Sequence, residues 1–132
     1  MDALKLFFII ALTGLALEFF VFSILDKVVG KPMKTHHKYS LGKNVSIMSV
    51  PIIAVIFLLL YEHYNYVQLF IMSAIIGTVA EYVFGRFVHH VEGKRAWTYH
   101  YGVLGGYTSY FSIPYWGGAG MLFVLIARFI GL

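Results

Sequence analysis

The chain has 132 residues, of which 60% are hydrophobic and only 12% are charged, whereas a soluble domain of this size carries about twice that share of charge. Several apolar stretches approach the roughly 20 residues that a helix needs to cross a bilayer, so the sequence predicts an integral membrane protein and excludes a soluble function. The formal net charge of +4 is therefore expected to report on membrane orientation and not on nucleic-acid binding.

Four apolar segments predict four membrane-spanning helices in a single transmembrane domain that covers residues 1–132. The expected spans are Leu6–Leu25, Val45–Tyr61, Val67–Val88 and Thr108–Ile130. No small-residue cleavage site follows the first span, so we do not expect it to be a removable signal peptide. The second and fourth spans carry Pro51 and Pro114 in their first turns, where the missing N–H of proline costs little.

The second half of the chain repeats the first half at an offset of 63 residues. Without a gap, the alignment gives 16 identities in the 58 pairs from Lys5 to Glu62, where a composition this apolar gives roughly six by chance. We interpret this as an internal duplication, with repeat 1 at about 5–62 and repeat 2 at about 68–125. Each repeat contains two crossings, so both have the same orientation. The predicted fold class is all-α, a four-helix bundle of two tandem parallel two-helix repeats.

Basic residues gather in two long loops. The segments 26–44 and 86–107 hold eight of the ten lysines and arginines, and the other two are Lys5 and Arg128. Because positively charged loops stay in the cytoplasm, we expect both long loops to be cytoplasmic in a cell or inner membrane, with both termini outside.

Each repeat places one carboxylate inside an apolar span. Glu18 and Glu81 occupy equivalent positions of the duplication. A carboxylate that faces lipid costs several kcal/mol, so each glutamate needs a partner, a wet cavity or a proton. We interpret the pair as one pseudo-symmetric ligand or proton site near the cytoplasmic leaflet. The alternative is that each glutamate is a packing residue, hydrogen-bonded across helices.

Small residues share a helical face with each glutamate. They are Ala11 and Gly14 in the first repeat, and Ala74 and Gly77 in the second. Small side chains let two helix backbones approach closely, so we expect this face to pack against another helix.

Polar loop residues that are identical in both repeats are candidates for closing over the glutamates. They are Lys31, Thr35 and His37 in the first repeat, and Lys94, Thr98 and His100 in the second. The two lysines could bind a phosphate, or they could only set the topology. No tight histidine and glutamate spacing supports a metal, and no phosphate-cradling loop or nucleophile motif is present. We expect no metal and no cofactor.

The second repeat resembles a known family. A Glu-Tyr-x-x-Gly helix end at 81–85 leads to a Gly-x-x-x-Trp-x-Tyr loop at 93–99 and then to a Trp-Gly helix start at 116–117. This pattern is similar to that of the CmpB-like family of small membrane proteins, usually labelled ABC-transporter permeases, in which Asp commonly stands at the position of Thr98. The resemblance implies a transport role and a separate partner ATPase.

Three functions remain open. The first is a transport-type protein, permease or channel-like, with its polar site on the two glutamates. The second is an accessory or structural subunit of a larger membrane complex. The third is an intramembrane enzyme that modifies a lipid or isoprenoid, with a glutamate as acid or base and His37 or His100 as its partner. The expected partners are membrane lipids and a homo-oligomer or larger membrane complex, and no nucleic acid.

Overall fold

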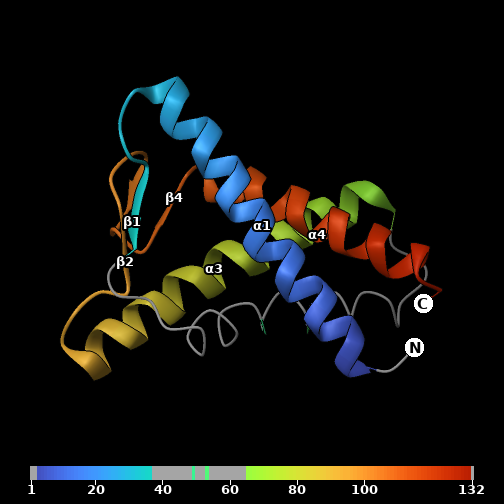
Figure 1. The fold of residues 1–132 in the computed structure, drawn as a ribbon. Coiled ribbons are helices and arrows are strands. Elements are labelled where there is room, and N and C mark those ends of the chain that lie inside the picture. Colours follow the sequence, from blue (N-terminus) through green and yellow to red (C-terminus); the bar gives the residue numbers. More distant parts are fainter. Residues whose placement is uncertain (1–2, 37–48, 50–52, 54–64, 132) are drawn as a thin grey trace.

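The computed structural model describes residues 3–36, 49, 53 and 65–131, and this part of the chain is mostly helical (Figure 1). It contains three long helices: α1 (Ala3–Val29), α3 (Tyr66–Glu92) and α4 (Ser112–Phe129). Each is long and apolar enough to cross a membrane, which agrees with the predicted membrane-protein class. The predicted second span at 45–61, with Pro51, lies outside the described residues except for Ser49 and Ile53, which are helical.

Helices α1 and α3 run a few residues beyond their predicted spans because polar residues and glycines end them. Asn65 and Gln68 form a capping box at the start of α3, each side chain accepting a hydrogen bond from the other residue's backbone N–H. At the far end Gly93 adopts a φ of 72°, and Gly30 adopts a φ of 78° after α1. Left-handed glycines commonly end helices, and a reading based on hydropathy alone stops before them.

Helix α4 begins later than predicted. Thr108 and Ser109, expected to open the last span, instead form a short strand, and the helix begins at Ser112. Pro114 is the third residue of α4, within the first turn, as expected from its missing N–H.

Helix α3 packs mainly against α4, and the two helices run antiparallel at this contact. Glycines allow the close approach. Gly77 faces Trp116, Gly120 faces Ser73, and Gly117 faces the ring of Phe70. A Cβ atom at any of these glycines would overlap the facing side chain, so the contact depends on small residues, as in many membrane helix pairs.

The buried side chains form two clusters. The larger joins Leu6, Ile10 and Ala11 of α1 to Leu69 of α3 and to α4, and the smaller lies where the loops meet the helix ends. Gly14, Ala74 and Gly77 are buried as well. Many large apolar side chains on the outer helix faces are exposed, as expected for helices that contact lipid; these include Leu12, Phe19, Ile75 and Val83.

Two small sheets connect the loops, a feature that the all-α prediction omitted. Strand β1 (Lys34–His36) pairs antiparallel with β2 (Trp97–Tyr99), so the loop after α1 lies beside the loop after α3 (Figure 1). The register pairs Thr35 with Thr98 at its centre. Strands β3 (Val103–Leu104) and β4 (Thr108–Ser109) form a second antiparallel pair. Strands of two or three residues are too short to give a periodic sequence signal.

The glycine contact between α3 and α4 can be tested with a matched pair of substitutions. Gly77→Ala places a Cβ against Trp116 and should destabilise the protein by about 1–3 kcal/mol, as overpacking does. Gly118→Ala lies in α4 with nothing within 4 Å and should be neutral or stabilising by up to about 1 kcal/mol. Thermal unfolding of the purified protein in detergent compares the two. Equal effects would contradict the packing described.

Candidate functional site

A lysine ammonium lies inside the protein against one of the two predicted glutamates. Nζ of Lys34 donates a hydrogen bond to Oε1 of Glu18 at 2.7 Å. The side chain of Lys34 is only 5% exposed and that of Glu18 is 13% exposed. Burying two charges costs several kcal/mol per ion unless they are paired closely, so this contact compensates both of them.

The turn after α1 brings Lys34 back to Glu18. Oδ1 of Asp26 accepts a hydrogen bond from the backbone N–H of Met33 at 2.9 Å, which fixes the return of the chain. The carbonyl of Met33 then accepts from the N–H of His100, and β1 pairs with β2. The Met33 side chain is fully buried. The position of the ammonium is therefore set by backbone contacts between two loops.

Three aromatic rings surround the ammonium of Lys34. Its Nζ lies 4.9 Å from the ring centroid of Tyr99, 5.2 Å from that of Trp97 and 5.6 Å from that of Phe22. A cation within about 6 Å of an aromatic face is attracted by the ring quadrupole, more strongly when water is excluded. We call Phe22, Trp97 and Tyr99 the aromatic cage. Together with Glu18 it surrounds the ammonium of Lys34.

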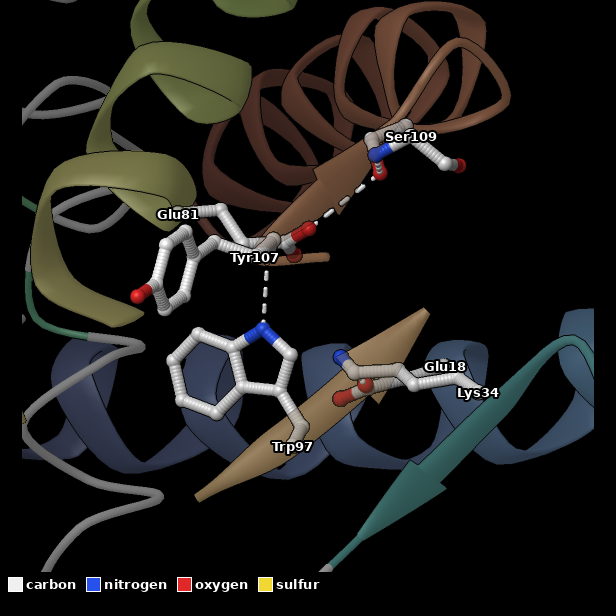
Figure 2. A network of polar contacts seen from close by, with 7 residues as sticks. Glu18, Lys34, Glu81, Trp97, Tyr107 and Ser109 are labelled. Carbon is white, nitrogen blue, oxygen red and sulfur yellow. Dashed lines mark hydrogen bonds and ion pairs between the residues drawn. The ribbon is translucent and has the colours of Figure 1, made fainter. Parts of the chain in front are cut away.

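Backbone contacts hold the two rings of β2 in place. Nε1 of Trp97 donates to the carbonyl of Tyr107 at 2.7 Å (Figure 2). The N–H of Tyr99 donates to the carbonyl of Gly106 at 3.0 Å. Gly85 of α3 lies under the indole, where a Cβ would come within 2.9 Å of the Trp97 ring. The glycine of the Glu-Tyr-x-x-Gly motif thus makes room for the tryptophan of the loop motif.

The second glutamate has hydroxyl partners. Glu81 is 4% exposed, and its Oε1 accepts from Oγ of Ser112 at 3.2 Å. Burial raises the pKa of Tyr99 well above its ordinary value of 10.0, and the charge of Glu81 is the next largest cause of the rise. A hydrogen bond with Ser112 lowers the same pKa. The charge of Glu18 adds to the rise. Tyr99 therefore stays a neutral hydroxyl that interacts with both carboxylates.

Other polar atoms are buried near the start of α4. Oγ1 of Thr108, Oγ of Ser109 and Nε1 of Trp116 make no hydrogen bond to any other described residue. Ser109 donates its backbone N–H to Ser112, the partner of Glu81. Because buried polar groups are nearly always paired, these three atoms leave hydrogen-bonding capacity near the start of α4.

The loop residues selected from the duplication lie mainly at the surface. Oγ1 of Thr35 and Nε2 of His100 are 2.6 Å apart in an exposed hydrogen bond, which joins the loop after α1 to the loop after α3. Thr98, the cross-strand neighbour of Thr35, is partly buried. Lys31 is exposed with its ammonium over the ring of Tyr101, and Lys94 is exposed after α3. His37 lies outside the described residues.

The sequence did not predict Lys34, Ser112 or the aromatic cage as site residues. Lys34 and Trp97 would be equivalent in the predicted duplication, but they differ in type, so identity between the halves does not point to them. The structure brings these two unlike residues together in one site. Trp97 and Tyr99 were visible as part of the family motif, which was the available signal.

Among the described residues, no group of three or more histidines and carboxylates could hold a metal ion.

The ion pair predicts a strong energetic coupling between Lys34 and Glu18. Lys34→Met leaves the carboxylate without this cation and should destabilise the protein by about 3 kcal/mol, and Glu18→Gln should have a comparable effect. The double variant should lose at least about 1 kcal/mol less than the sum of the two. Unfolding in detergent measures all four proteins. Additive losses would show that the pair is not coupled.

The comparisons with known proteins agree with the resemblance noted in the sequence. A family profile described as "Putative ABC-transporter type IV" matches residues 5–130. No curated protein and no solved structure matched the chain. The match covers nearly the entire sequence, including both glutamates, α3, α4 and all but the first two residues of α1. The chain therefore belongs to the CmpB family of transporter-type membrane proteins.

Proposed function

We propose that this protein is a transport-type membrane protein whose interior site accepts a monovalent cation, either a proton or a small ammonium ion. The observation that carries the proposal is the buried ammonium of Lys34, held by Glu18 and the aromatic cage. The burial of this ammonium supports a site that stabilises a monovalent cation. A mobile ammonium ion could be held by the same carboxylate and the same rings.

The position of Glu81 supports it as the place where the cation would enter. Glu81 is buried in the α3 span, and its partner Ser112 is a neutral hydroxyl. A buried carboxylate whose protein partners are neutral attracts a cation. We propose that Glu81 receives the cation. Tyr99, whose pKa is raised by the charges of both glutamates, would link Glu81 to Glu18. Lys34 would then act as a tethered cation that the incoming charge displaces from the cage.

We also propose that the site is built by two equivalent repeats in a four-helix bundle. Three features support this. Helices α1 and α3 are each 27 residues long and begin 63 residues apart, the offset of the duplication. Their terminal glycines, Gly30 and Gly93, are equivalent. The β1–β2 register is centred on the equivalent pair Thr35 and Thr98, as a two-fold axis through the strands requires. By the same offset Ser49 corresponds to Ser112 and would approach Glu18.

Two alternatives predict other results in the same assay. An accessory subunit of a larger membrane complex, such as one that works with a partner ATPase, would carry no ion alone. An intramembrane enzyme would change an added lipid without moving charge. A homo-oligomer is compatible with all three, because exposed apolar side chains cover the outer faces of the helices.

The transport proposal predicts a loss of flux when Glu81 is neutralised. The full-length protein in liposomes should carry current on a methylammonium or proton gradient, read by solid-supported membrane electrometry. Glu81→Gln should lower this current at least about tenfold, because it removes the charge that receives the cation. Glu92→Gln, the same chemical change at the exposed end of α3, should leave it unchanged.

Two results would contradict the proposal. A folded Glu81→Gln protein with normal current would remove Glu81 from the pathway. A wild-type protein that carries neither cation would favour the accessory alternative, which the addition of a partner ATPase could then test.

A further inference from the structure

A basic pocket lies on the last turns of α3, apart from the buried carboxylates. It has a volume of about 340 Å³ and is lined by Arg86, His89, His90 and Tyr107. Three of these four residues carry or can accept a positive charge, and no carboxylate lines the pocket. The pocket is separate from the cation site proposed above, and its charge has the opposite sign.

The pocket wall from the loop is held rigidly. The hydroxyl of Tyr107 lies 2.7 Å from Nδ1 of His89 in a hydrogen bond, and its ring packs edge-on against Tyr82. The guanidinium of Arg95 lies 4.6 Å from the centroid of the same ring and donates to the carbonyl of Gly105. Tyr107 is thus fixed from several sides, so this wall exists before any ligand arrives.

Arg86 and His90 form the open wall of the pocket. They are four residues apart on α3, so their side chains lie on one face of the helix, and both are exposed. Arg86 makes no ion pair with any other described residue. A guanidinium binds phosphate through two parallel hydrogen bonds, and adjacent imidazoles add further donors. The C-terminal helix dipole weakly disfavours an anion there, so the side chains must supply the attraction.

We propose that this pocket binds a phosphate group. The ligand is either the headgroup of an anionic lipid or a soluble phosphate monoester, and both offer the same oxygen acceptors to Arg86. Arg86, His89 and His90 lie on the last turns of α3, an apolar helix of membrane-spanning length, and the end of such a helix is where anionic lipid headgroups would be met. It is also linked to the cation site, because the carbonyl of Tyr107 accepts from Trp97 of the aromatic cage (Figure 2).

Native mass spectrometry of the full-length protein in detergent tests the proposal. The protein is titrated with phosphatidylglycerol, phosphatidylcholine, glycerol 3-phosphate and inorganic phosphate. We expect the wild-type protein to bind at least one of the phosphate compounds. Its Kd should rise at least about tenfold in the double variant R86Q/H90Q, because charge-assisted hydrogen bonds are lost. Arg86→Lys keeps the charge but not the paired geometry and should give an intermediate loss. Lys27→Gln, an exposed basic residue outside the pocket, should bind like the wild type.

The four ligands distinguish the sources. Retention of phosphatidylglycerol over phosphatidylcholine, lost in R86Q/H90Q, would identify a lipid headgroup. Binding of glycerol 3-phosphate or inorganic phosphate, lost in the same variant, would identify a soluble ligand. If none of the phosphates binds, or if R86Q/H90Q binds as tightly as the wild type, the phosphate site is overturned.

Discussion

Two carboxylates inside apolar helices are the constraint on which the rest of this structure depends. Glu18 cannot remain charged in an apolar setting without compensation, and Lys34 supplies it at 2.7 Å. To reach Glu18, the chain must turn back after α1, and the β1–β2 pairing and the Asp26–Met33 hydrogen bond fix that turn. The short β1–β2 sheet therefore places the ammonium of Lys34 at Glu18.

Glycines provide the space in which this arrangement fits. Gly85 lets Trp97 lie against α3, and Gly77 lets Trp116 lie between α3 and α4. The same glycines therefore serve both packing and the site, because Gly85 makes room for a ring of the aromatic cage and Gly77 for a ring in the contact between α3 and α4. This is a physical reason for the spacing of Glu81, Gly85 and Trp97 in this chain.

The sequence predicted the features that depend on local pattern. Hydropathy located three of the helices and the family motif identified the family, whereas the duplication and the pairing of Glu18 with Glu81 stay predictions. It did not locate the partners of the glutamates, because Lys34 reaches Glu18 through a fold-back that has no periodic signal, and Tyr99 reaches Glu81 through the tertiary structure. Ser112 was similarly hidden, since a serine at a helix start usually indicates only a cap.

The central claim is that the ammonium of Lys34 is buried against Glu18 and aromatic rings. Its accessibility can be measured directly by acylating the intact protein with an amine reagent and locating the modified lysines by mass spectrometry. Lys34, which is 5% exposed, should be modified at least about tenfold more slowly than exposed Lys27 and Lys31, and Glu18→Gln should raise its rate. Modification of Lys34 as fast as Lys31 would contradict the buried pair and the cation site built on it.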